Sequence, residues 1–155
     1  MNGVRIRAAE SGDADAVAEV FIASFGTLTF LPKLHTDEET VGFITSTVMA
    51  KQEVLVAEVA HAIVGFVAMS HGNHLEHLYV HPDHQGRGIG STLLERARTR
   101  MPGGFRLWTF QANAGARRFY ERHGLRVVEL TDGAGNEEKT PDALYEWLPG
   151  DEGTP

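Results

Sequence analysis

The segment from His71 to Gly90, HGNHLEHLYVHPDHQGRGIG, holds two kinds of residue that could do chemistry. It contains five histidines, followed by three glycines at alternate positions. Closely spaced imidazoles can bind a transition metal. Glycine-rich turns can bind a phosphate through backbone N–H groups. The two kinds of site need different backbone geometry, so the surrounding sequence decides between them.

The histidines do not fit one metal-binding geometry. Their spacing of 3, 3, 4 and 3 residues would place them on one face of a helix, but Gly72-Asn73 and Pro82 interrupt any helix. On a strand, His74 and His77 would point to opposite faces. The last two histidines fall in the turn before the glycines. We therefore expect no metal site among the five, which are His71, His74, His77, His81 and His84.

The glycine segment from Gln85 to Ser91 has the composition of an anion-binding turn. It lies between a predicted strand and a predicted helix, where free N–H groups and the positive end of the helix dipole meet. Arg87 adds a fixed positive charge. The Rossmann fingerprint would need a glycine at position 91, and the P-loop would need Gly-Lys-Ser/Thr, so neither fits. The alternative for the glycines alone is a tight turn without a ligand.

The elements that must position these residues follow from hydrophobic periodicity. Helices are expected from Ser11 to about Ser24, from Thr36 with a Thr36-x-x-Glu39 capping box, after the glycines, and from Asn113 to His123. The unit from Leu75 to Phe110 predicts two parallel strands joined by a right-handed crossover. The expected strands are Val4–Ala8, Glu53–Val59, Ala62–Ser70, His74–Val80, Phe105–Phe110, Leu125–Leu130 and Ala143–Leu148.

This order of elements predicts an α/β (α+β) fold with a mixed, twisted sheet and helices on both faces. A chain of 155 residues fits one domain, which we assign to residues 1–149, with a disordered tail at 150–155.

The net charge of −7 argues against nucleic acid as the main partner, and it suits either a cationic partner or simple solubility. The chain has no cysteine, which excludes disulfides and thiolate metal sites. No apolar run is long enough to span a membrane, so we expect a cytoplasmic protein.

Two linked motifs resemble the GCN5-related N-acetyltransferase (GNAT) family. The first is Val80-x-Pro82-x-x-Gln85-Gly86-x-Gly88-x-Gly90, which precedes an amphipathic helix. The second follows 23 residues after Gly90 and reads Asn113-x-x-Ala116-x-x-Phe119-Tyr120-Glu121-x-x-Gly124. The resemblance extends over about residues 4–148. It implies the GNAT fold and direct transfer of an acetyl group from acetyl-CoA to a primary amine of a small molecule or protein, within a ternary complex.

The resemblance also implies which residues bind acetyl-CoA. The pyrophosphate would rest on the backbone of the glycine loop, and the pantetheine arm would pair with the edge of the preceding strand, as in β-augmentation. The two parallel strands are then expected to splay apart into a cleft. Asn113 would contact the cofactor, although it could also be a plain helix N-cap. The implied binding residues are Leu78, Tyr79, Val80, Gln85, Gly86, Arg87, Gly88, Ile89, Gly90, Ser91, Asn113 and Tyr120.

Tyr120 matches the general acid of the family, which protonates the departing thiolate. Without the motif, Tyr120 would be read as an aromatic residue that packs in the core.

The attacking amine needs a base, because an alkyl amine is almost fully protonated at neutral pH. By two-residue alternation, His74, Glu76, Leu78 and Val80 share one face of their strand. We predict Glu76 as the base, with His74 as the alternative, unless Glu76 is only a solvated residue.

Two features bear on the acceptor. Some family members carry a base at the position that is Trp108 here, which weakens an interpretation as a ribosomal-protein N-terminal acetyltransferase. The long segment from Thr131 to Asp142 carries Asp132, Glu137, Glu138 and Asp142, which could attract a cationic amine or could simply be solvated. The sequence leaves open a homodimer, and it leaves a non-catalytic CoA-binding module with the same fold as the alternative function.

Overall fold

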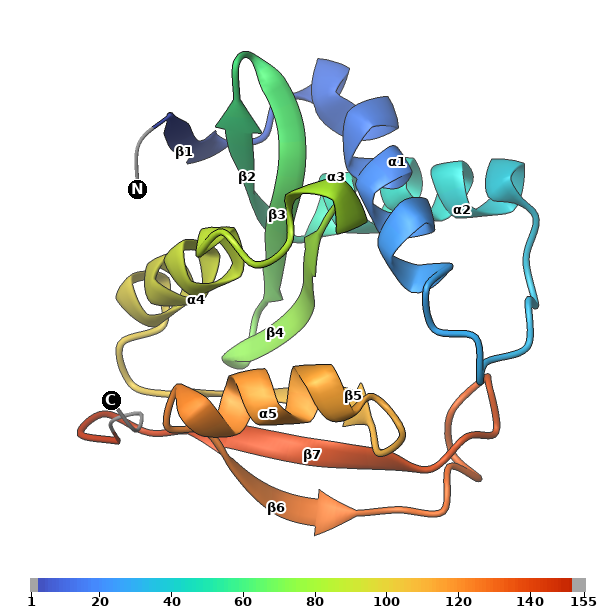
Figure 1. Ribbon diagram of the computed structural model, residues 1–155, viewed down its shortest axis with the longest axis vertical. Helices are drawn as coiled ribbons and strands as arrows, with labels where there is room; N and C mark the ends of the chain where they lie inside the picture. The colour runs from blue at the N-terminus through green and yellow to red at the C-terminus, as the bar shows by residue number, and fades with distance from the viewer. Residues whose placement is uncertain (1–2, 152–155) are drawn as a thin grey trace.

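The computed structural model describes residues 3–151. Its strands form a seven-stranded mixed sheet (Figure 1). The strand order is β1-β2-β3-β4-β5-β7-β6, and β4 with β5 is the one parallel pair of neighbours among these strands. The strands are β1 (Val4–Ala8), β2 (Glu53–Val59), β3 (Ala62–Ser70), β4 (His74–Val80), β5 (Phe105–Phe110), β6 (Arg126–Leu130) and β7 (Asp142–Trp147).

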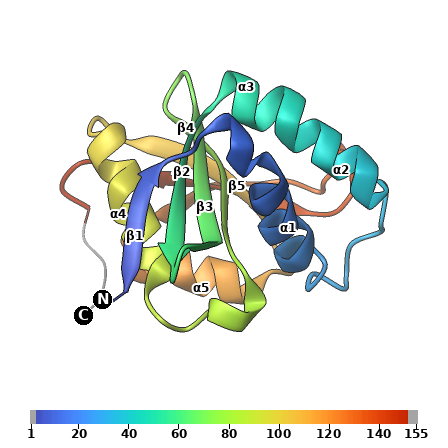
Figure 2. The same ribbon diagram turned by 90° about the horizontal axis from the view of Figure 1, so that it is seen from above.

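Helices cover both faces of the sheet. Figure 2 shows α1 and α2 on one side of β1, β2 and β3, and α4 on the other side. The helical elements are η1 (Ser11–Asp13), α1 (Ala14–Phe25), α2 (Asp37–Phe43), η2 (Ile44–Val48), α3 (Met49–Lys51), η3 (Pro82–His84), α4 (Ile89–Arg100) and α5 (Ala114–Arg122). The mixed sheet and its two helical layers confirm the predicted fold class.

The sequence signals for element boundaries are largely confirmed. The first five strands have the predicted bounds, β6 begins one residue later than predicted, and β7 begins and ends one residue earlier than predicted. The capping box before α2 forms in both directions: the Glu39 amide donates to the Thr36 hydroxyl at 3.1 Å, and the Thr36 amide donates to the Glu39 carboxylate at 2.8 Å. In the predicted tail, the Asp151 amide donates to the Leu148 carbonyl at 3.0 Å. Residues 152–155 of that tail lie outside the described residues.

Two apolar cores hold the helices on the sheet. The core beneath α4 contains Leu75, Leu93, Leu94, Leu107 and Tyr145. The core beneath α1 and η2 contains Val17, Val20, Ile44, Val56 and Phe66. Burial of these side chains contributes about 1.5–3 kcal/mol each. The sheet is therefore anchored on both faces, which fixes the positions of its strand edges.

Strand β4 contains a β-bulge that the sequence pattern did not reveal. Ala68 of β3 pairs with His77, while the next residue, Met69, pairs with Leu75. Glu76 is therefore the extra residue that has no partner on β3. A bulge of this kind bends the strand and re-aims the side chains on either side of it.

The bulge makes two sequence predictions about β4 wrong. Leu75 and Leu78 both pack in the core beneath α4, although strict alternation would put residues three apart on opposite faces. His77 packs on the other face, against Phe66 and Phe21. His74 and His77, which flank this interruption, consequently lie on the same face rather than on opposite ones. Strict alternation predicted that four residues of β4 would share one face, but the structure divides them between the two faces. These residues are His74, Glu76, Leu78 and Val80.

The two parallel strands diverge, as predicted. One pair of residues, His74 with Arg106, is in register between β4 and β5, and the Arg106 amide donates to the Asn73 carbonyl at 3.1 Å. Beyond this point β5 pairs only with β7, through six residue pairs from Phe105 to Phe110. The rest of the facing edge of β4 is therefore open.

Candidate active site

A cavity of about 620 Å³ occupies the space between the diverging strands. Its walls come from β4, β5, the glycine loop and the first turns of α5. The residues that line it on the strands run from Leu75 to Val80 and from Leu107 to Phe110. The structure thus brings both predicted motifs to one cleft, although they are far apart in the sequence.

The open edge of β4 presents backbone groups at alternate residues. The His81 amide donates to the Val64 carbonyl at 2.8 Å, and the register that follows pairs Tyr79 with Phe66. In an antiparallel ladder only alternate residues bond to a given neighbour. Leu78 and Val80 therefore turn their backbone toward the cleft, whereas Tyr79 turns its backbone toward β3.

The carbonyl of Val80 is already engaged. It accepts hydrogen bonds from the Ser24 hydroxyl of α1 and from the Gln85 side-chain amide, each at 2.9 Å. Ser24 is buried. These bonds tie α1 and the start of the glycine loop to the end of β4. The backbone N–H and C=O of Leu78 and the N–H of Val80 remain to pair with a ligand.

The glycine loop has the backbone that an anion site requires. Gly86 and Gly88 have φ angles of 79° and 82°, in the left-handed region that favours glycine, and Gly88 is the N-cap of α4. A Cβ atom at Gly90 would lie 3.4 Å from the Phe119 ring, so glycine lets α4 approach α5 closely. The first N–H groups of α4 have no partner within the helix and point out of its N-terminus.

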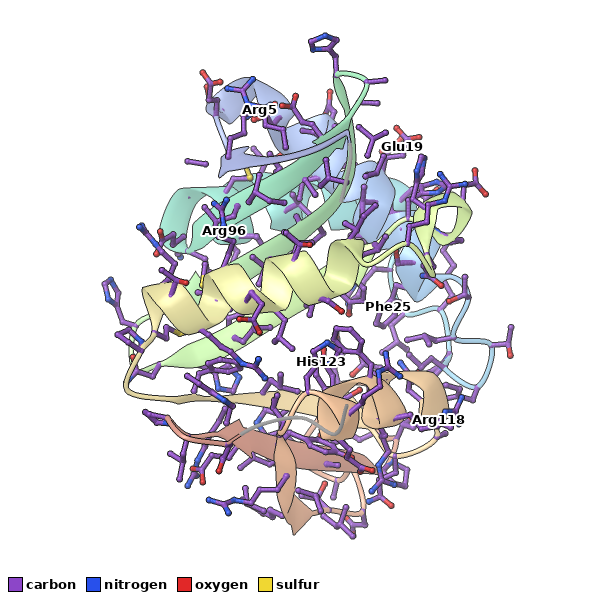
Figure 3. The ribbon with its side chains drawn as sticks, turned by 60° about the vertical axis from the view of Figure 1, so that its left-hand side comes forward. Arg5, Glu19, Phe25, Arg96, Arg118 and His123 are labelled. Atoms are coloured by element: carbon purple, nitrogen blue, oxygen red, sulfur yellow. The ribbon has the colours of Figure 1, made fainter. Side chains whose placement is uncertain are left out.

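A histidine at the end of α5 links this helix to α4. The Nδ1 atom of His123 lies 2.8 Å from the Phe119 carbonyl, and its Nε2 atom lies 2.9 Å from the Ser91 hydroxyl. A carbonyl only accepts, so Nδ1 carries the proton, and in the neutral ring Nε2 accepts from Ser91. Figure 3 shows His123 between the two helices. The loop that begins α4 is therefore held at a fixed distance from α5.

Tyr120 lies on α5 with its side chain in the cleft wall and only 8% of its surface exposed. Burial raises the pKa of its hydroxyl well above the usual value, because the phenolate would lose its hydration, and nearby Tyr79 adds to this effect. The group is thus a protonated donor throughout the neutral range. Asn113 acts as the N-cap of α5, since its side-chain oxygen accepts from the Ala116 amide at 3.2 Å, and it also lines the cleft.

Glu76, the predicted base, lies at the bulge and lines the cleft. Its carboxylate is 3.2 Å from Nε2 of His74, and their side chains are 30% and 28% exposed. The two candidates for the base are therefore partners rather than independent alternatives. The contact lies close to the point where β4 and β5 separate.

His77 also lines the cleft, a position that the spacing of the five histidines did not predict. Its ring contacts Phe21, Phe43 and Phe66. Burial lowers the pKa of His77 to about 4, and the nearby His74 adds to this shift. The imidazole is therefore neutral at physiological pH, and its burial among aromatic rings could not be predicted without knowledge of the bulge.

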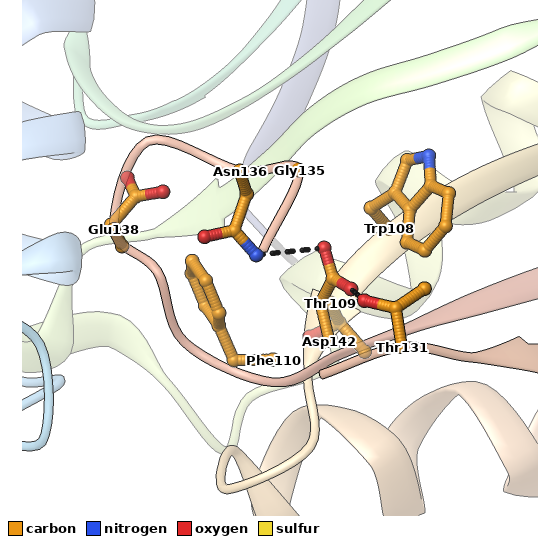
Figure 4. A pocket seen from close by; sticks show the side chains of 8 residues that line it. All are labelled: Trp108, Thr109, Phe110, Thr131, Gly135, Asn136, Glu138 and Asp142. Carbon is orange, nitrogen blue, oxygen red and sulfur yellow. Dashed lines mark hydrogen bonds between the residues drawn. The ribbon is translucent and has the colours of Figure 1, made fainter. Parts of the chain in front are cut away.

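A second cavity of about 500 Å³ adjoins the cleft at β5 (Figure 4). Trp108, Thr109 and Phe110 line both cavities. The other walls come from the loop between β6 and β7. His35 of the α1–α2 loop reaches this loop, with its Nε2 atom 2.5 Å from the Glu137 carboxylate. This contact joins the loop between α1 and α2 to the acidic segment from Thr131 to Asp142.

Two kinds of feature are absent from the part of the chain from residue 3 to 151. No three histidine, aspartate or glutamate side chains there converge into a metal-binding group. No helix there has the length and apolar character to cross a membrane.

Comparisons with known proteins agree with this geometry. A family model described as "Acetyltransferase (GNAT) domain" matches residues 50–126. An uncharacterized N-acetyltransferase of Archaeoglobus fulgidus is 30% identical over 150 residues, which cover 86% of this chain and 100% of that protein. The peptidyl-lysine N-acetyltransferase YiaC of Escherichia coli is 25% identical over 142 residues, which cover 92% of this chain and 95% of YiaC.

A solved structure has the same fold. The PaiA N-acetyltransferase of Thermoplasma acidophilum, in complex with coenzyme A, superposes with a TM-score of 0.74 at 22% identity. The match covers 94% of this chain and 98% of PaiA. The overall fold of this chain is therefore shared with a solved acetyltransferase structure.

Proposed function

The chain belongs to the GNAT acetyltransferase family, and from this membership we propose that it moves an acetyl group from acetyl-CoA directly to a primary amine of a small molecule or a protein. The name of YiaC, a peptidyl-lysine acetyltransferase, supports an acceptor with an alkyl amine. The acidic net charge of −7 supports a cationic acceptor as well.

Acetyl-CoA would bind along the cleft. Its pyrophosphate fits the N–H groups from Gly86 to Ser91, where Gly86 leaves open space and the helix dipole is positive. Arg87 would add charge to this site. The pantetheine arm fits the free backbone groups of Leu78 and Val80. The contact between Ser91 and His123 keeps the loop in place against α5.

The proposed chemistry is a direct displacement at the thioester carbonyl. Glu76, oriented by His74, accepts a proton from the acceptor ammonium, directly or through water. The neutral nitrogen attacks the carbonyl carbon, a C–N bond forms and the C–S bond breaks. Tyr120 donates a proton to the departing sulfur, and the nitrogen loses its second proton, which restores the phenol. The net products are the amide, the free thiol and one proton.

One observation carries this proposal: the cleft collects an open strand edge, a glycine-rich helix N-terminus, a buried protonated tyrosine and a carboxylate. The test is to incubate the purified chain with acetyl-CoA and a panel of amines and peptides, while thiol release is followed and the acetylated acceptor is identified by mass spectrometry. We expect amine-dependent thiol release with intersecting initial-rate patterns and no acetylated enzyme. The proposal fails if acetyl-CoA binds and no amine increases thiol release; a covalent acetyl-enzyme with ping-pong kinetics would contradict direct transfer.

A further inference from the structure

The cavity beside β5 has a wall that keeps its shape. In the β6–β7 loop, the Asn136 side chain donates to the Thr140 carbonyl at 2.7 Å and to the Asp142 carboxylate at 3.0 Å. Gly133 has a φ of +84°, and a Cβ atom there would lie 2.3 Å from the Thr140 backbone. The loop therefore has one tightly packed conformation, despite its length. Side chains that project from it into the cavity start from fixed positions (Figure 4).

Three of the four acids in this loop have a hydrogen-bond or ion-pair partner. The Asp132 carboxylate accepts from the Ala134 amide at 2.9 Å. Glu137 contacts His35 at 2.5 Å. Asp142 accepts from Asn136 and from the Thr131 hydroxyl. Their charges are thus partly neutralised or used as hydrogen-bond acceptors.

Glu138 is different. Its side chain lines the cavity, and within residues 3–151 no ion pair and no hydrogen bond joins its carboxylate to another group. Its charge reaches the cleft side of the cavity, because it contributes, after burial, to the raised pKa of Tyr79. Among the residues that line the cavity in the described part of the chain, none is a lysine or an arginine. The nearby Lys139 directs its ammonium group to the Ala134 carbonyl at 2.8 Å instead of to Glu138.

Aromatic rings stand opposite this carboxylate. Trp108, which is 44% exposed, and Phe110 form the β5 wall of the cavity. Phe110 is held from the other side by Phe30, with their ring centroids 6.0 Å apart. An ammonium group is attracted both by a carboxylate and by the face of an aromatic ring. The cavity therefore combines two features that favour a cation and a size that suits a small alkyl chain.

We propose that Glu138, with Trp108 and Phe110, binds a second ammonium group of the acceptor, so that the preferred acceptor is a small aliphatic diamine. This inference rests on the proposed function. The nitrogen that attacks must be neutral and must reach the cleft between β4 and β5, where Glu76 lies. Glu138 lies outside that cleft, in the adjoining cavity. It thus selects the substrate through the nitrogen that does not react.

The test compares α,ω-diaminoalkanes of increasing length with amino alcohols of the same length, in which a hydroxyl replaces the second ammonium. We expect the wild-type protein to prefer the diamine in kcat/KM by about tenfold at one chain length, since one ammonium–carboxylate contact of moderate exposure has about this value. The preference should be found mainly in KM. Glu138→Gln should remove it, and Glu138→Lys should reverse it in favour of ω-amino acids.

Glu137→Gln is the matched control, because Glu137 lies on the same loop and contacts His35 instead of the cavity. It should leave the ratio between diamine and amino alcohol unchanged. Calorimetric titration of the diamine into the CoA-bound protein gives a second readout that needs no turnover. Loss of diamine binding in Glu138→Gln alone would support the inference even if no acetylation occurs, in which case only the proposed function fails. Equal ratios for diamine and amino alcohol, or a ratio that Glu138→Lys does not shift, would overturn the inference while leaving acetyl transfer intact.

Discussion

At the scale of single residues, Tyr120 is a proton donor whose environment keeps it protonated. Burial raises the pKa of the phenol, so the hydroxyl is not lost to ionisation at neutral pH, and its donation to a thiolate has to be aided by position. We expect Tyr120→Phe to lower kcat about 100-fold, with little change in the affinity for acetyl-CoA measured by calorimetry.

Tyr145→Phe is the appropriate control for Tyr120. Its hydroxyl donates to Glu121 at 2.5 Å and accepts from Arg117 at 2.9 Å, so it belongs to a structural network outside the cleft. This variant should lose stability, by about 1–3 kcal/mol, and keep its kcat. A Tyr120→Phe variant with full kcat would show that another group or water protonates the sulfur.

Glu76 and His74 form one unit, and their variants should differ in degree. Glu76→Gln removes the proton acceptor, so we expect kcat at neutral pH to fall about 100-fold. The loss should shrink as the pH approaches the pKa of the free amine, near 10, because the acceptor then arrives already neutral. His74→Gln keeps the carboxylate and should cost less. A pH–rate profile of Glu76→Gln parallel to that of the wild type would rule out Glu76 as the base.

At the scale of secondary-structure elements, the glycines of the turn before α4 allow a backbone conformation that directs N–H groups toward an anion. Gly88→Ala puts a Cβ atom on a residue with a φ of 82°, which costs about 1–2 kcal/mol, and it tilts the N–H groups at the helix start. We expect weaker binding of acetyl-CoA, by at least about tenfold. Gly72→Ala, at a φ of 89° in the β3–β4 turn, has the same backbone cost away from the cleft. The two variants should lose similar stability in urea, and equal affinity for acetyl-CoA would contradict the role of the loop.

The elements also show where the sequence was informative and where it was not. Period-two and period-3.6 patterns located the strands and helices, because each element buries one face, and the capping residue Thr36 marked its helix start. The bulge at Glu76 left no such signal: it depends on how β4 pairs with β3, and it changed which faces His74 and His77 occupy. In the same way, Glu138 could not be separated from its three acidic neighbours until the hydrogen bonds of the loop were known.

At the scale of the whole molecule, the burial of His77 makes the stability of the fold depend on pH. His77 lies among aromatic rings beside the cleft, and its pKa falls from 6.5 to about 4 in the folded state. Between these two values the unfolded chain binds a proton that the folded protein does not. The free energy of unfolding is therefore not reduced by His77 above about pH 6.5. As the pH falls toward 4, His77 lowers this free energy by at most about 3 kcal/mol.

Urea unfolding between pH 4 and 7.5 measures this effect. His77→Phe keeps a ring in contact with Phe21, Phe43 and Phe66 but has no proton to gain, so we expect the slope of unfolding free energy against pH to decrease across the interval between 4 and 6.5. His71→Gln changes an exposed histidine in a turn and should leave the slope as it is. If the slope is unchanged in His77→Phe, His77 takes up its proton in the folded protein. A charged imidazole would then lie in the wall of the acceptor cleft and disfavour a cationic amine there.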